Sequence, residues 1–215
     1  MNNIIISNCC LGADVHRKLN NSKYNNPFMG TLILDDFEYL KLCKGLKKYM
    51  NNEFTISNNI IPTVYTNQTN NSIYIHPAVN RNYPILINDD INIHAIHFTN
   101  NKTDLLNFNE RQSRFNNILK YEKYKIFCIM TYTTLFLKHD NYVDYINDFL
   151  KNNDNDNNMI FLFAGPKLEG ITEKHYIVTD YMNQNIIRHK NNVNVELNFD
   201  KDSTIISDYI NKLYK

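Results

Sequence analysis

Short apolar runs recur along the chain, and the first of them lies close to its start. Ile4, Ile5 and Ile6 form a β-branched run that is typical of a buried strand. A polar turn over residues 8–12 follows, and the pattern then becomes helical through residue 19. The chain is therefore predicted to begin with a strand, a tight turn and a helix.

The next signals are weaker but keep the same alternation. Residues 31–34 are apolar and indicate a second strand or an extended segment. Asp35 or Asp36 can cap a helix that runs to about residue 50. Its apolar positions follow a spacing near 3.6 residues: Phe37, Leu40, Leu46 and Tyr49. Between residues 54 and 75, short β-like runs separated by asparagine-rich turns predict peripheral strands or loops.

Two stronger β-like runs cover residues 83–87 and 91–98, and the polar turn between them suits a tight connection. Residues 101–119 are predicted to form a helix. Its inner face carries Leu105, Phe108, Phe115 and Leu119.

The second half alternates more plainly between the two periodicities. Strands are predicted over residues 125–131, 159–163 and 175–179, and helices over residues 141–150 and 203–213. The asparagine-rich residues 152–158 indicate an exposed loop. This order predicts a single α/β domain over residues 1–215, with a mixed, largely parallel sheet flanked by helices.

Charge and composition exclude several classes of partner. With 23 Lys and Arg against 22 Asp and Glu, the net charge of +1 argues against nucleic acid or an acidic membrane as the main partner. No apolar run approaches a membrane span, and the first residues lack a secretory signal, so we expect a soluble, cytoplasmic protein. Abundant Asn, Ile, Lys and Tyr indicate an AT-rich genome, as in a low-GC bacterium or a giant virus, whose protein would lie in the host cytoplasm.

The first candidate for chemistry is Cys10, with its neighbour Cys9. A thiol between a first strand and a first helix lies where backbone N–H groups and the helix dipole stabilise a thiolate. The alternative is packing, because free cysteine is often buried as a small apolar residue, and spacing alone favours that role. Cys43 and Cys128 complete the set, which forms no C-x-x-C pair, so reduced thiols are expected.

Two histidines form the second candidate. His94 and His97 are three residues apart in a predicted strand, so they point to opposite faces and cannot bind one metal together. In a strand, His97 would lie on the same face as Ile91 and Ile93. At the end of such an apolar face, an imidazole is either a core residue or a catalytic base at a sheet edge.

Anion binding is the third possibility. Arg111 and Arg114 lie three residues apart on a predicted helix and can form a fork for phosphate or carboxylate, although a solvated face with local ion pairs is the alternative. The common nucleotide, zinc and hydrolase motifs are absent. No metal ligand is assigned, and any cofactor is left open. The acidic pair of Asp89 and Asp90 is more typical of a turn than of a metal site.

Five stretches, taken in order, resemble a known set of motifs. They are ISNCCLG at residues 6–12, NPFMG at 26–30, YPI at 83–85, DINIHAIHF at 90–98 and FNERQSRFN at 108–116. The set is similar to an uncharacterised bacterial family from polysaccharide gene clusters that is labelled exopolysaccharide biosynthesis protein. Asn92 and Phe108 stand where that family carries Glu and Trp. The same order is also similar to a family predicted to be papain-like cysteine peptidases.

The resemblance implies an enzyme that builds or modifies surface glycans by glycosyl or acyl transfer, with a sugar nucleotide or glycan as substrate. It implies that Cys10 is the nucleophile or a thiol lining the site, His97 the base and Asn8 an orienting or oxyanion-binding amide. The implied substrate contacts are Arg111, Arg114, Asp90 and His94. A cysteine hydrolase and a non-catalytic binding module, in which Asn8 and Asp90 only form turns, remain as alternatives.

Overall fold

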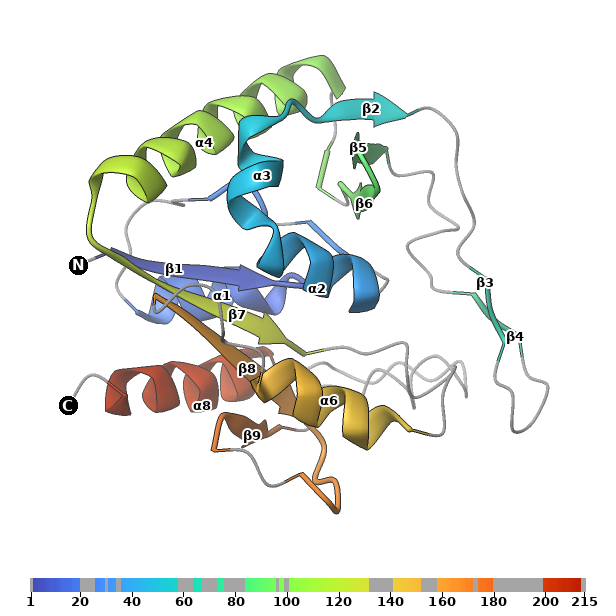
Figure 1. The fold of residues 1–215 in the computed structure, drawn as a ribbon, viewed down its shortest axis with the longest axis vertical. Coiled ribbons are helices and arrows are strands. Elements are labelled where there is room, and N and C mark those ends of the chain that lie inside the picture. Colours follow the sequence, from blue (N-terminus) through green and yellow to red (C-terminus); the bar gives the residue numbers. More distant parts are fainter. Residues whose placement is uncertain are drawn as a thin grey trace.

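The computed structural model describes most of the chain, in thirteen stretches. These are residues 2–19, 26–29, 31–33, 36–57, 64–66, 73–75, 84–95, 97–98, 101–131, 141–151, 158–171, 174–179 and 199–213. They form the predicted α/β fold, with a parallel sheet between layers of helices and a smaller antiparallel sheet beside it (Figure 1).

Four parallel strands form the main sheet, in the order β1-β7-β8-β9. They are β1 (Asn2–Ser7), β7 (Tyr124–Met130), β8 (Met159–Gly165) and β9 (Tyr176–Val178). Ile6 lies opposite Cys128, and Cys128 lies opposite Phe161. Because β7 and β8 are buried on both faces, their sequences are nearly continuous apolar runs.

Helices cover both faces of this sheet, as alternate side chains of each strand require. Ile5 and Phe127 point to the face covered by α1 (Leu11–Lys18) and α8 (Phe199–Lys212), where they pack with Val15 and Ile206. The residues of opposite parity, such as Ile6, pack on the other face against α2 (Asp36–Lys44) and α6 (Tyr142–Lys151). The core on that side continues into α3 (Leu46–Asn51) and α4 (Asn101–Tyr121).

The antiparallel elements come from the middle of the chain. The strands β2 (Thr55–Ser57), β5 (Ile85–Asn88) and β6 (Ile91–His94) form one sheet in the order β2-β5-β6. The strands β3 (Val64–Thr66) and β4 (Ile73–Ile75) form a separate ribbon. A turn at Asp89 and Asp90 joins β5 to β6, and Asp89 adopts a φ of 51° there, a left-handed conformation that aspartate tolerates better than most residues.

Residues 31–33 connect the smaller sheet to the end of β1. The amide of Ile33 donates to the carbonyl oxygen of Asn8 at 2.9 Å, directly after β1. On its other side, Leu32 forms an antiparallel bridge with His94, the last residue of β6. Of the strand predicted over residues 31–34, the described residues 31–33 thus form a short bridge between the two sheets, and residue 34 lies outside the described residues.

Two predicted elements differ from the structure in a way that has a local cause. The helix expected to run to residue 50 is divided at Gly45, whose φ of −97° and ψ of 18° depart from helical values. The strand expected over residues 91–98 ends at His94, which leaves His97 in a turn. Residues 152–157 of the predicted loop lie outside the described residues.

Candidate functional site

The connections that follow β1 and β7 define a special place in the sheet. These strands are neighbours. The helix directly after β1 is α1, on one face of the sheet, and the next described helix after β7 is α6, on the opposite face. In open α/β sheets, ligands bind outside the carboxyl ends of the strands. We call this place, formed by residues 7–12 after β1 and Thr131 after β7, the switch point.

Asn8 ties the two strand ends together at the switch point. Its side-chain oxygen Oδ1 accepts hydrogen bonds from the amide of Thr131 at 3.0 Å and from Thr131 Oγ1 at 3.3 Å. Cys9 Sγ shares a further hydrogen bond with Thr131 Oγ1. Asn8 is fully buried, so its amide oxygen serves to position the turn that carries the thiols.

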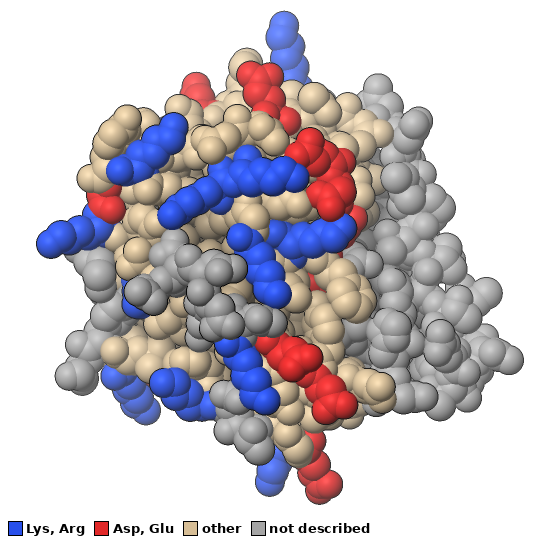
Figure 2. Space-filling model, viewed as in Figure 1, with Lys and Arg blue, Asp and Glu red and all other residues tan. Residues whose placement is uncertain are grey.

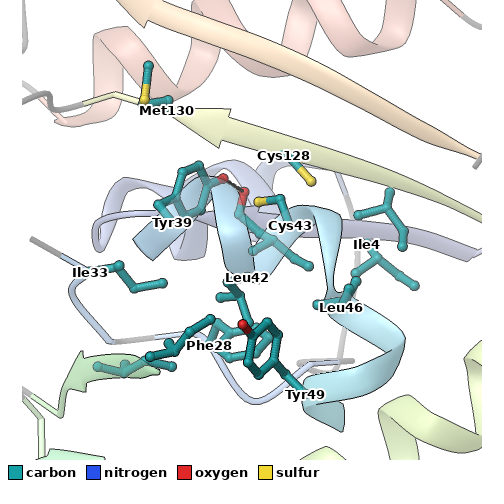
Figure 3. Packing of buried hydrophobic residues seen from close by; sticks show 14 of the residues in the cluster. Ile4, Phe28, Ile33, Tyr39, Leu42, Cys43, Leu46, Tyr49, Cys128 and Met130 are labelled. Atoms are coloured by element: carbon teal, nitrogen blue, oxygen red, sulfur yellow. Dashed lines mark hydrogen bonds between the residues drawn. The ribbon is translucent and has the colours of Figure 1, made fainter. Parts of the chain in front are cut away.

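Tyr39 of α2 supports the same strand ends from the other face. Its hydroxyl lies 2.9 Å from each of two carbonyl oxygens, those of Ile6 in β1 and Ile129 in β7, and donates to them. The side chain is completely buried, and this burial raises the pKa of the phenol well above its ordinary value. Figure 3 shows Tyr39 with the sulfur atoms of Cys43 and Cys128 in the packed space between α2 and the sheet.

Gly12 allows α1 to start close against β1. A Cβ atom at this position would lie 2.6 Å from the Cβ of Ser7, closer than side-chain carbons approach one another. The amide of Gly12 donates to the carbonyl oxygen of Cys9, and the amide of Ala13 donates to that of Cys10. Cys10 is the residue that precedes the helix, as the strand, turn and helix pattern predicted.

The thiol of Cys10 is neutral in the resting protein. It is half-buried, and burial, followed by the proximity of Cys9, raises its pKa to about 12 from an ordinary value of 9.0. The turn was expected to stabilise a thiolate through the helix terminus, and the opposite shift is found because desolvation outweighs that effect. Any nucleophilic role of Cys10 therefore requires a group that accepts its proton during the attack.

The two candidate histidines have different surroundings. His94 ends β6 and is only 6% exposed, and burial lowers the pKa of its imidazole below 6.5. It is therefore neutral at physiological pH. His97 lies beyond the strand and is exposed. The sequence-based choice of His97 assumed that side chains alternate between the faces of a strand up to this residue. The strand ends three residues earlier, so the assumption does not hold for His97.

Asp90 is engaged at the surface by α2 and α3. Its carboxylate forms an ion pair with Lys41 Nζ at 2.9 Å and accepts a hydrogen bond from the hydroxyl of Tyr49 at 2.7 Å. These hydrogen bonds, that of Lys41 first, lower the pKa of Asp90 to about 2. Asp90 thus anchors the β5–β6 turn. Figure 2 shows basic and acidic side chains interspersed over this face of the molecule.

The predicted arginine pair lies on α4, which packs against α3. Arg111 is half-buried and Arg114 is exposed. Between them, the side chain of Gln112 is buried, and its Nε2 donates to the carbonyl oxygens of Met50 at 3.0 Å and Asn52 at 2.6 Å. Asn116, four residues later, also donates to the carbonyl oxygen of Met50. This part of the motif satisfies carbonyl groups at the end of α3, a role that the four-residue spacing of Gln112 and Asn116 could have indicated.

Metal binding and membrane crossing find no support in the part of the chain that the structure describes. There, no three His, Cys, Asp or Glu side chains are grouped so that they could hold a metal ion. None of the described helices combines the length and apolar character needed to cross a membrane.

Comparison with known proteins gives one match. Residues 2–131 match the model of a family described as Domain of unknown function (DUF1919). The chain belongs to this family. No curated protein and no solved structure matches the chain.

The part of the chain that matches DUF1919 contains every group described at the switch point. It begins with β1, includes α1, α2 and the β5–β6 hairpin, and ends at Thr131, directly after β7. The strands β8 and β9 and the helices α6 and α8 lie outside the match. The switch point therefore belongs to the DUF1919 part of the chain.

Proposed function

We propose that this DUF1919 protein is an enzyme of surface polysaccharide or glycan biosynthesis or modification, which transfers a glycosyl or acyl group at the switch point. The observation that carries the proposal is the position of the thiol turn, residues 8–10, at the carboxyl ends of two neighbouring parallel strands, where ligands bind in open α/β sheets. The resemblance of its motifs to the exopolysaccharide biosynthesis family supports glycans as the substrates.

The roles follow from the surroundings of each group. Cys10 is the half-buried group of the turn and takes the role of nucleophile or of a thiol that lines the site. Asn8 and Thr131 are positioning residues, because their hydrogen bonds fix the turn relative to β7. Arg111 and Arg114 are the groups of the motif that suit the phosphates of a sugar nucleotide.

A transfer assay with two variants of Cys10 tests the proposal. The protein is incubated with a panel of sugar nucleotides and acyl thioesters together with glycan acceptors, and products are detected by mass spectrometry. If Cys10 is the nucleophile, Cys10→Ala and Cys10→Ser both lose about 10²-fold or more of the rate. If it only lines the site, Cys10→Ser keeps most of the rate. Absence of transfer with every donor and acceptor pair contradicts the proposal.

A non-catalytic glycan-binding module is the second candidate, and a specific observation favours it. Three polar groups of the motifs, Asn8, Asp90 and Gln112, are engaged in internal contacts that hold elements together. In this case the protein binds a glycan without turnover, and Cys10→Ala leaves the affinity unchanged. The neutral thiol of Cys10 counts against a hydrolase that rests as a thiolate.

A further inference from the structure

The register of the bridge between the two sheets fixes the direction of His94. The amide of Leu32 donates to the carbonyl oxygen of His94 at 2.9 Å, and the amide of His94 donates to that of Leu32 at 2.8 Å. Residues that face each other in an antiparallel bridge carry their side chains on the same side, with Cβ atoms about 5 Å apart. The imidazole of His94 therefore lies on the side of the Leu32 side chain.

Leu32 contacts both His94 and residues of the thiol turn. Its side chain packs in the apolar cluster that contains Cys9 and Leu11, which lie at the turn and at the start of α1. The amide of the next residue, Ile33, donates a hydrogen bond to the carbonyl oxygen of Asn8. A single extended segment thus separates the backbone of His94 from the backbone of the switch point.

The charge states of His94 and Cys10 match each other. Both are neutral at physiological pH, since burial lowers the pKa of the imidazole and raises that of the thiol. The titratable groups on neighbouring elements are Cys9 and Cys10 of the thiol turn and Asp36 and Glu38 of α2. Glu38 accepts a hydrogen bond at 2.8 Å from Asn92, which shares the face of His94 two residues earlier. A neutral imidazole can remove the proton of a neutral thiol during an attack.

We propose that His94 is the catalytic base of the switch point and that it serves Cys10 in the transfer of an acyl group from an activated ester or thioester to a glycan hydroxyl. This inference rests on the proposed function and narrows it to acyl transfer. His97, the histidine that the strand pattern favoured, is exposed in the turn beyond β6 and has no such connection to the thiol turn through the described backbone.

The reaction balances with the two side chains alone. The sulfur of Cys10 forms a bond to the acyl carbon, the thiol proton passes to His94, and the carbonyl electron pair moves to oxygen. The bond to the leaving group then breaks, and the leaving atom takes the proton from the imidazolium. A glycan hydroxyl attacks the thioester in turn, its proton passes through His94, and Cys10 leaves as the thiol.

Acetylation by p-nitrophenyl acetate tests the role of His94. The release of p-nitrophenol is followed against pH, and the acetylated residue is identified by peptide mass spectrometry. We expect acetylation at Cys10, at a rate that rises with pH through a midpoint below 6.5 as His94 loses its proton. His94→Gln is expected to lower the rate about 10²-fold at neutral pH and to remove this rise.

The His97→Gln variant tests the competing assignment under the same conditions. Loss of the rate and of the pH-dependent rise in His97→Gln, but not in His94→Gln, overturns the inference. So does acetylation of Cys10 in His94→Gln at the unaltered rate and pH profile, which leaves the proposed function standing. If the unaltered protein is not acetylated at Cys10 at all, the proposed function fails at its first step, and the role of His94 fails with it.

A second measurement needs no substitution and so holds even if His94→Gln does not fold. The imidazole resonances of the unaltered protein are followed by NMR before and after alkylation of Cys10. We expect the resonances and the titration midpoint of His94 to change, and those of His97 to stay. Unchanged His94 resonances overturn the inference.

Discussion

At the scale of single residues, the chemistry of the switch point depends on Cys10 being a neutral thiol. Its half-buried position and the neighbouring Cys9 raise the pKa to about 12, so very little thiolate is present at neutral pH. A protein with this thiol needs a base that acts during the reaction, whereas a stabilised thiolate would not. The two situations differ in how the thiol reacts with alkylating agents.

We expect the alkylation of Cys10 by iodoacetamide to be slow at pH 7 and to rise steadily up to pH 10 without a plateau. The thiolate fraction increases towards a midpoint near 12, above the ordinary value of 9.0. The rate is measured by peptide mass spectrometry and compared with that of Cys10 in protein unfolded by urea, which should react faster at every pH below 9. A plateau near neutral pH in the folded protein would show a stabilised thiolate instead.

Gly12 is the residue whose size sets how closely α1 approaches β1. We expect Gly12→Ala to lower the free energy of unfolding by about 1–3 kcal/mol, because the added methyl group meets the Cβ of Ser7. Urea denaturation provides the measurement. In protein that already carries Ser7→Gly, the substitution Gly12→Ala should lower the free energy of unfolding by less than it does in the unaltered protein. The reason is that the clashing Cβ of Ser7 is then absent. Additive effects of the two substitutions would contradict this contact.

At the scale of elements, α2 is tied to the main sheet through one hydroxyl group. Tyr39 donates to the carbonyl oxygens of Ile6 and Ile129, which belong to the strands on either side of the switch point. Since the phenol is completely buried, its removal leaves these carbonyl groups without that donor. Removal of the hydroxyl should therefore lower the stability of the protein and also alter the thiol turn.

We expect Tyr39→Phe to lower the free energy of unfolding by about 1–3 kcal/mol and to increase the alkylation rate of Cys10 as the strand ends loosen. Urea denaturation and peptide mass spectrometry give the two values. Tyr121→Phe is the matched control, because Tyr121 is 82% exposed at the end of α4, and it should change neither. Equal stability of Tyr39→Phe and the unaltered protein would contradict the described role.

The sequence predicted elements well where apolar periodicity decided them. The hairpin at Asp89 and Asp90 and the strands around Ile5, Phe127 and Leu162 all follow from it. The break at Gly45 was missed, since an isolated glycine is tolerated within a helical pattern and does not by itself indicate a break. The early end of β6 at His94 was missed as well. A pairing partner decides where a strand stops, and the apolar pattern of one strand does not contain that information.

At the scale of the whole molecule, the layered α/β architecture could be predicted because the alternation of strands and helices is visible along the chain. The composition of the site could be predicted only in part. The turn with Cys10 was found, but its partner Thr131 is 123 residues away from Asn8, and no local pattern connects them. In the same way, no local pattern indicates the bridge of His94 with Leu32, a residue far from it in the sequence.

In the proposed function, substrate binds at the carboxyl ends of β1 and β7. The most direct test is a map of backbone amide shifts by NMR as sugar nucleotides, acyl thioesters and glycan oligomers are titrated into the isotope-labelled protein. We expect the largest shifts on residues 8–13 and on Thr131, with smaller ones at His94. Shifts that leave these amides unchanged and gather on another element, such as α8, would contradict binding at this place.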